Sequence, residues 1–353
     1  MDMARKLASL LPATLSIRWP KDSPSAERAG KRIARQSTAS AFRVMVRKEF
    51  SDHIRSWRFG ILLGIIFLAC IGSLYSAISA LLAGSAADQA EDGFLFLRMF
   101  TLSDGSLPNF TAFVSFLGPL MGIALGFDAV NTERSKGTLS RLISQPIYRD
   151  DFLKAKFAAA LLIIGIVIFT LGLLVMGLGL LVIGFPPTFE EFARVVLFLL
   201  AAVVYVGFWL NLAILLSIRF RQAATSALSA ISLWIFFSVF YSMIMGLIAR
   251  SLAPESEADT GAILSFQRLM LSLNRLSPAE LFNEATTTLL MPAVRSLGPL
   301  TMEQLVGALP SPLPLGQSLL LVWPQLTGLL AATMICFGIS YYLFMRQEIR
   351  SRS

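Results

Sequence analysis

Aspartate, glutamate, lysine, arginine and histidine are absent from six long apolar stretches of this 353-residue chain. Proton pumps, ion-coupled transporters and intramembrane proteases usually need such groups at depth, because these residues carry the proton or ion relay. The absence argues against these classes and indicates energy supplied from outside the membrane. The stretches run roughly over Phe59–Ala83, Phe110–Phe127, Phe157–Ile183, Val195–Ile218, Ala224–Ala249 and Ser318–Met345.

Histidine and cysteine are scarce. His53 is the only histidine, which excludes a histidine-based metal site and any catalytic triad or dyad that needs a histidine within the membrane. Cys70 and Cys336 both fall inside apolar stretches, where we interpret them as small packing residues. The sequence therefore offers no disulfide framework.

A phosphate-binding loop is also missing. Gly30 and Lys31 are followed by Arg32, and the first glycine of the Gly-x-x-x-x-Gly-Lys-Ser/Thr pattern is lacking. Outside the apolar stretches the longest segments have about 58 and about 68 residues, near or below the size at which a core alone supports folding. We expect neither a nucleotide site nor a soluble catalytic domain.

Each apolar stretch is long enough to cross a bilayer as a helix. About 20 helical residues span the hydrocarbon core of about 30 Å, and lipid admits only structures that satisfy their backbone polar groups internally. The sequence predicts an all-α polytopic membrane protein with six transmembrane helices, formed by residues 59–345.

Basic residues lie unequally on the two sides of the predicted bundle. Six spans place both termini on one side together with the loops near 128–156 and 219–223, and 24 of the 30 lysines and arginines fall there. The positive-inside bias makes that side cytoplasmic and the segment 250–317 external. We expect a multi-pass protein of a cell membrane, plasma or inner. The basic residues flank spans, so they indicate topology and not nucleic-acid binding.

The chain before the first span divides into two parts. Residues 1–40 predict a mobile basic cytoplasmic N-terminus, and residues 41–58 an interfacial amphipathic helix. The apolar face of this helix consists of Phe42, Val46, Phe50, Ile54 and Trp57. A plain cytosolic continuation of the first span is the alternative. Residues 346–353 form a short cytoplasmic tail.

Small and weakly polar residues mark helix contacts within the spans. Gly118, Gly122 and Gly126 repeat at every fourth position and leave one face of the second span smooth, either for a subunit interface or for an internal contact. Asn211 predicts an interhelical hydrogen bond, with a substrate contact as the alternative.

The external segment carries signals for a helix. Ser277, Pro278 and Glu280 fit an N-cap, a first-turn proline and a capping-box acid, and Pro292 fits the end of the helix. We expect short amphipathic helices that form an external lid before the last span. Their role is either to pack the end of the bundle or to contact substrate.

The loop 128–156 has the most specific pattern in the chain. Leu139, Leu142 and Ile143 form an apolar face at helical spacing, Gly137 permits a sharp turn, and Pro146 stops the helix. A short helix with an exposed apolar stripe indicates docking to a partner. A solvated connector, the alternative, would not need the stripe.

This loop resembles that of the permeases of type-2 (ABC-2) ABC exporters. The resemblance rests on Glu133, on the run from Lys136 to Leu139, on the run from Leu142 to Ile147, and on Arg149 with Lys156. It covers roughly residues 41–347, including the amphipathic elbow helix before the first span. The long N-terminal extension and the large external segment depart from the usual pattern. The external segment resembles that of a subgroup of the family, with matching residues at Ser277, Pro278, Leu281, Phe282 and Pro292.

The resemblance implies a non-catalytic permease that works with a separate ATPase. ATP and Mg would bind the partner, none would bind this chain, and two permease chains, identical or similar, would pair in the bilayer. The coupling helix would run from Glu133 to Ser144. The implied ATPase-coupling residues are Glu133, Lys136, Gly137, Thr138, Leu139, Arg141, Leu142, Ile143, Pro146 and Arg149.

The identity of the cargo does not follow from the sequence. An uncharged bundle favours lipids, peptides or amphipathic compounds over small ions. Two alternatives stay open: a non-transporting member of the same family that passes ATP-driven motion to an envelope partner, and an unrelated membrane scaffold.

Overall fold

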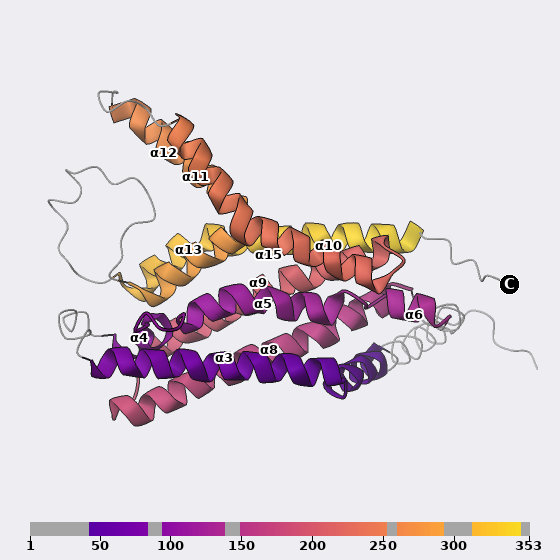
Figure 1. The fold of residues 1–353 in the computed structure, drawn as a ribbon, viewed down its shortest axis with the longest axis horizontal. Coiled ribbons are helices and arrows are strands. Elements are labelled where there is room, and N and C mark those ends of the chain that lie inside the picture. The colour runs from indigo at the N-terminus through magenta and orange to yellow at the C-terminus, as the bar shows by residue number, and fades with distance from the viewer. Residues whose placement is uncertain (1–41, 84–93, 138–148, 253–259, 293–312, 347–353) are drawn as a thin grey trace, which may run out of the picture. The chain divides into compact units, whose positions relative to one another are not determined.

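The computed structural model describes residues 42–83, 94–137, 149–252, 260–292 and 313–346 (Figure 1). The chain divides into two compact units, Met1–Arg43 and Val44–Ser353, and the second unit contains the features that follow. The predicted N-terminal segment 1–40 and the tail 347–353 lie outside the described residues.

Helices make up all the regular structure of the described residues, and six of them are long and apolar enough to cross a membrane. This confirms the predicted all-α fold with six spans. The helices extend several residues beyond the apolar stretches, because helical hydrogen bonding continues into the polar flanks. They are α3 (Trp57–Leu82), α5 with α6 (Phe110–Ser135), α8 (Arg149–Ile183), α9 (Phe189–Arg219), α10 with α11 (Ala223–Leu252) and α15 (Leu315–Arg346).

Helix α9 forms the centre of the bundle. It packs against α5, α8, α10 and α15, and its tyrosine and tryptophan side chains are among the largest that are fully buried. The helix begins with a capping box in which Thr188 and Glu191 exchange hydrogen bonds. Glu191 also accepts the backbone N–H of Phe96 at 3.0 Å, which attaches the short helix α4 (Leu95–Thr101) to α9.

The glycine stripe of α5 lies against α9. A Cβ on Gly122 would come within 2.6 Å of the Val206 carbonyl oxygen, and one on Gly126 within 2.7 Å of the Leu210 carbonyl oxygen. On Gly118 it would meet the Val206 side chain. The stripe therefore serves an internal contact and not a subunit interface.

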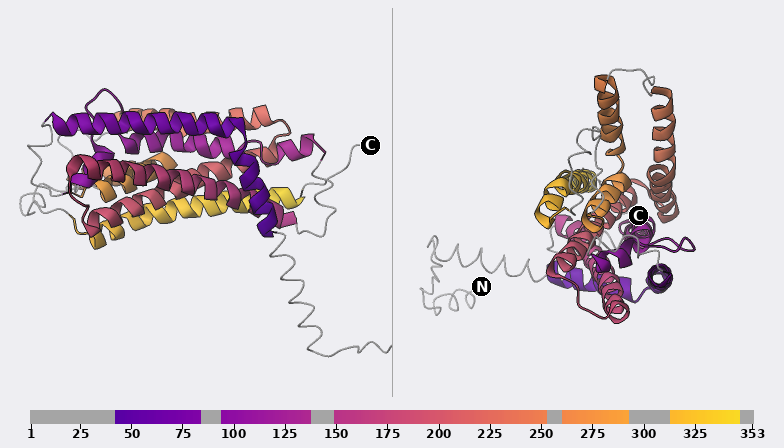
Figure 2. Two further views of the ribbon diagram at one scale, coloured as in Figure 1. Left: turned by 90° about the horizontal axis from the view of Figure 1, so that it is seen from below. Right: turned by 90° about the vertical axis from the view of Figure 1, so that its left-hand side faces the viewer.

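The second half of the fifth span leaves the bundle. The span consists of α10 (Ala223–Ile235), a π-helix (Phe236–Phe240) and α11 (Tyr241–Leu252). In its most apolar 18-residue stretch 6% of the residues are buried, against 61% in α9. Figure 2 shows α11 paired with α12 (Thr260–Asn274), away from the other helices.

Helix α13 (Pro278–Leu290) packs inside the bundle, against α9 and α15. It starts after Ser277 with Pro278 in its first turn, as the sequence predicts, and ends before Pro292. The capping box does not form, because Ser277 Oγ donates to the Phe237 carbonyl at 3.4 Å and makes no capping bond. The Phe282 ring stacks on Tyr205, which lies at the middle of α9. The expectation of a lid outside the bundle is thus wrong for α13.

Arg194 of α9 is fully buried near the start of that helix. Its guanidinium donates to the carbonyl oxygens of Leu289 at 3.1 Å and of Leu313 at 2.5 Å, and to Ser318 Oγ at 3.1 Å. It also pairs with Glu190 at 2.8 Å. One side chain therefore ties together α9, the end of α13 and the start of α15.

Candidate functional site

The candidate site lies at the elbow end of the bundle, where the chain enters α3, where α5 passes into α6, and where α8 begins. A helix covers residues 42–54, and its part within the second unit, residues 44–54, is called the elbow helix. It ends before Ser56, which caps α3 by accepting the N–H of Phe59 at 3.2 Å. The sequence predicted one amphipathic helix over residues 41–58, but the helix breaks at Ser56, and Trp57 and Arg58 belong to α3.

The residues of the predicted apolar face have different positions. Phe42 belongs to the first unit, and Val46 is partly buried. Phe50 packs against the core, whereas Ile54 is 48% exposed. Trp57 is the first residue of α3 and is 82% exposed, so it does not belong to the elbow helix. Helical spacing alone placed Trp57 on the apolar face, because this spacing does not show that the helix breaks at Ser56.

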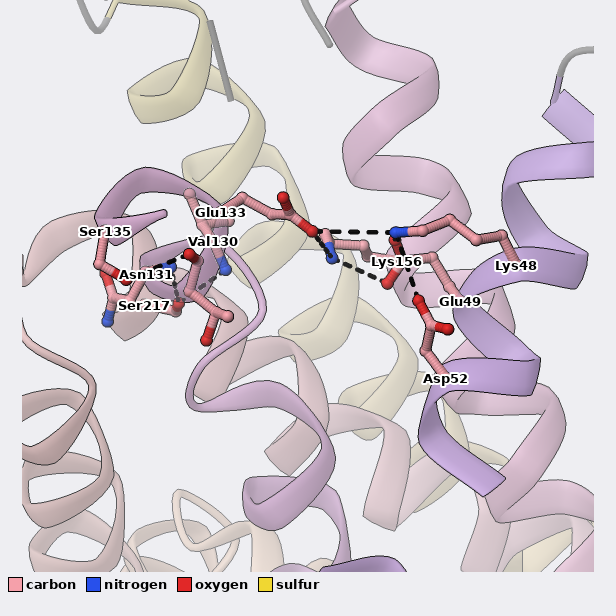
Figure 3. Close-up of polar contacts among 10 residues, drawn as sticks. Lys48, Glu49, Asp52, Val130, Asn131, Glu133, Ser135, Lys156 and Ser217 are labelled. Atoms are coloured by element: carbon pink, nitrogen blue, oxygen red, sulfur yellow. Dashed lines mark hydrogen bonds and ion pairs between the residues drawn. The ribbon is translucent and has the colours of Figure 1, made fainter. Parts of the chain in front are cut away.

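A buried lysine joins three elements at this end (Figure 3). Lys156 of α8 lies with its Nζ 2.8 Å from Glu49 of the elbow helix and 3.9 Å from Glu133 of α6 (Asn131–Ser135). Lys48 contacts the same two acids at 3.2 and 3.9 Å. We call Lys48, Glu49, Glu133 and Lys156 the Lys156 network.

The network is largely shielded from solvent. The side chains of Lys156 and Glu49 are 8% and 11% exposed, and the Lys156 ammonium also lies 5.1 Å from the centre of the Phe152 ring. Burial opposes ionisation of Glu49, but the adjacent Lys156 and Lys48 outweigh it, so the pKa of Glu49 lies below its ordinary value. Glu49 is therefore ionised near neutral pH.

Helix α6 is also attached to α9. The hydroxyl of Ser217 accepts the backbone N–H groups of Val130 and Asn131 at 3.0 and 3.2 Å. After α6 the chain turns at Gly137, whose φ of 68° lies in the left-handed region that favours glycine. The turn that the sequence predicted at Gly137 is therefore present and ends the helical run that contains Glu133, whereas the remainder of the predicted coupling helix, up to Ser144, lies outside the described residues.

The other predicted loop residues divide between described and undescribed parts of the chain. Lys136 lines a cavity of about 760 Å³ at the elbow end, and Arg149 is the first residue of α8. The cavity lies between the elbow helix, α3, α5 and α6, and His53 and Asp128 also line it. Outside the described residues lie Thr138, Leu139, Arg141, Leu142, Ile143 and Pro146.

A family model described as ABC-2 family transporter protein matches residues 43–349. The chain belongs to the ABC-2 transporter family. This ABC-2 permease is also similar to the "probable ABC transporter permease protein NosY" of Pseudomonas aeruginosa, with 26% identity over 205 residues, 56% of this chain and 67% of the relative. The resemblance drawn from the loop is confirmed at the family level, and the protein is a multi-pass membrane subunit of an ABC transporter.

The sequence did not predict the partners in two contacts of this permease. Glu49 stands among basic residues of the elbow helix, and only the structure brings it to Lys156, 107 positions away. Asn211 donates from Nδ2 to the Thr333 carbonyl at 2.8 Å, which is the interhelical bond that the sequence favoured over a substrate contact, although its partner was not predicted.

Proposed function

We propose that this ABC-2 permease is the membrane subunit of an exporter driven by a separate ATPase, which docks on the loop 128–156. The observation that carries the proposal is the Lys156 network. It connects α6, at the start of this loop, to α8 and to the elbow helix through charged contacts of 2.8 to 3.9 Å.

The contacts at the elbow end support a mechanical route from the loop into the bundle. A force on α6 would reach α9 through Ser217, and α8 and the elbow helix through Lys156. Charged contacts that are shielded from water resist separation more strongly than exposed ones, so these elements would move as one body. Glu133 would then fix the base of the second span, and the apolar residues Leu139, Leu142 and Ile143 would meet the ATPase.

The proposed assembly is the one that the family resemblance implies. ATP and Mg would bind the ATPase and not this chain, and two permease chains would form the transmembrane part. The 24-to-6 distribution of basic residues supports cytoplasmic termini in a plasma or inner membrane, with the opposite end external. The cargo would be a lipid, a peptide or an amphipathic compound.

The test is ATPase activity of the partner reconstituted with the permease in liposomes. We expect Gly137→Val to abolish the stimulation by the permease, because valine does not tolerate the left-handed backbone at this turn. Gly184→Val is the matched control. Gly184 has a φ of 84° and, like Gly137, open space where a Cβ would lie, but it is at the opposite end of the bundle.

Each result has a defined meaning. Full stimulation by the Gly137→Val variant would contradict coupling through this loop. Stimulation that never depends on a transported compound would support the mechanical role towards an envelope partner. No stimulation by the unmodified permease would favour a scaffold.

A further inference from the structure

Helix α13 carries ionisable groups to the middle of the bundle. Phe282 stacks on Tyr205 with the ring centres 4.4 Å apart, and Tyr205 lies halfway along α9. Ser277, just before α13, contacts Phe237 of the π-helix in the fifth span. The first turns of α13 therefore lie deep in the bundle, and its end approaches Arg194 near the start of α9.

Glu284 is held at this depth by two partners. Its Oε2 accepts from Arg275 Nε at 3.0 Å and from Gln325 Nε2 at 2.9 Å. Gln325 lies about 15 Å along α15 from the start of that helix, at 1.5 Å per residue. The acid is thus positioned by α15 and by the chain just before α13.

Glu280, one turn earlier, has no hydrogen-bond or ion-pair partner among the described residues. It is partly buried and lies one helical turn from Glu284, which is already paired. The Oε1 atom of Gln325, a residue only 2% exposed, also has no donor within the described part of the chain. The region therefore has two acids, one arginine, and a buried acceptor that lacks a donor.

The more open face of α13 is polar along its length. Glu280, Asn283 and Thr287 recur at helical spacing on this face, and Asn283 accepts the hydroxyl of Ser115 of α5 at 3.1 Å. Carboxylate and amide groups facing lipid hydrocarbon are costly, so such a face belongs towards a water-filled cavity or another protein surface.

We propose that this face of α13 lines the route of the transported molecule at mid-depth and selects molecules that carry a protonated amine, with Glu280 binding the ammonium group. The inference rests on the proposed function. Glu284 is already paired with Arg275, so Glu280 supplies the net negative charge, and Gln325, which binds Glu284, has an Oε1 atom that still lacks a donor within the described residues. The six apolar stretches of the sequence contain no carboxylate, because these acids come from the segment between the last two stretches.

The experiment measures binding to the purified permease in nanodiscs by calorimetry, with empty nanodiscs subtracted. Octylammonium, octyltrimethylammonium and octyl sulfate share one alkyl chain and differ in charge and in N–H donors. We expect octylammonium to bind most tightly and octyl sulfate not to bind above the empty nanodiscs. Glu280→Gln, which keeps the shape of the side chain, should weaken octylammonium binding about tenfold, as expected for a lost charged hydrogen bond.

Asp104→Asn is the control, since it removes one carboxylate from a loop outside the α13 region while keeping an oxygen that accepts from Ser76. Its octylammonium affinity should equal that of the unmodified permease. Unchanged affinity in Glu280→Gln, equal binding of octyl sulfate, or no octylammonium binding above the empty nanodiscs would each overturn the amine assignment. No ATPase is present, so these results leave the Gly137→Val test of the proposed function independent.

Discussion

Lys156 and Glu49 form an ion pair that is shielded from water, and such pairs behave differently from surface salt bridges. Desolvation of two charges offsets much of their attraction, so an intact pair adds little net stability compared with a well-packed apolar pair. Loss of one partner leaves the other charge buried and uncompensated. The pair therefore favours one position of the elbow helix, because any other position would leave the buried Lys156 charge without its partner Glu49.

We expect Glu49→Gln to destabilise the folded permease by about 3–5 kcal/mol, the usual cost of removing one member of a buried pair. Glu49→Leu combined with Lys156→Met should recover most of this loss, because no charge is left unpaired. Thermal unfolding of the purified protein in detergent measures both. Asp52→Asn, a change to an acid whose side chain is 60% exposed, serves as the control and should leave the melting temperature nearly unchanged.

A Glu49→Gln variant as stable as the unmodified protein would show that Glu133, 3.9 Å from Lys156, compensates alone. The pH dependence has a defined sign. Because the folded-state pKa of Glu49 lies below its ordinary value of 4.5, its stabilising contribution is present above that pH. It is lost as the pH falls through the lower, folded-state value.

At the scale of elements, the contact between α5 and α9 depends on the absence of side chains. The backbones approach so closely at Gly122 that a methyl group would overlap the carbonyl oxygen of Val206. Lipid tails are as apolar as the helix surfaces, so the hydrophobic effect does not drive helices together in a membrane. Van der Waals contact from such close approach is therefore a main source of helix association there.

Gly122→Ala should therefore lower the free energy of unfolding by about 1–3 kcal/mol, the usual range for overpacking, despite the higher helix propensity of alanine. Gly165→Ala in α8 is the matched control, because nothing lies within 4 Å of a Cβ at that position. It should be neutral or stabilising. Equal melting temperatures for the two variants would show that α5 and α9 can move apart without loss.

The sequence predicts elements well where one physical signal decides them. Six uncharged stretches correspond to six spans, because burial in lipid requires that composition over the length of a helix. The position of α13 inside the bundle escaped this signal, since the helix is short and carries Glu280 and Glu284, whose surroundings depend on residues of other helices. Trp57 was misplaced because helical spacing does not show the break at Ser56.

At the scale of the whole molecule, the second half of the fifth span, from the π-helix onward, has no buried residue, so the described part of the chain does not define what surrounds it. Large apolar side chains are exposed along it, including Phe240 at 50%, Met243 at 60% and Leu247 at 56%. Lipid or a second permease chain can cover such a surface. A second chain agrees with the pair of permease chains that the family resemblance implies.

We expect the assembled complex to contain two permease chains for two ATPase subunits. Native mass measurement in nanodiscs, with the ATPase present, determines this ratio. A single permease copy with two ATPase subunits would contradict the dimer. Replacement of Met243 by Arg should reduce the fraction of paired chains if α11 forms the contact, whereas Leu181→Arg, at a site 78% exposed on α8, should not.

Arg194 has a consequence for how this protein can vary. Its guanidinium fixes Leu289 and Leu313, so the chain between these two positions starts and ends at anchored points. The chain that joins α13 to α15 can therefore differ between related proteins while these two helix ends keep their places, because a single buried cation holds both of them to α9.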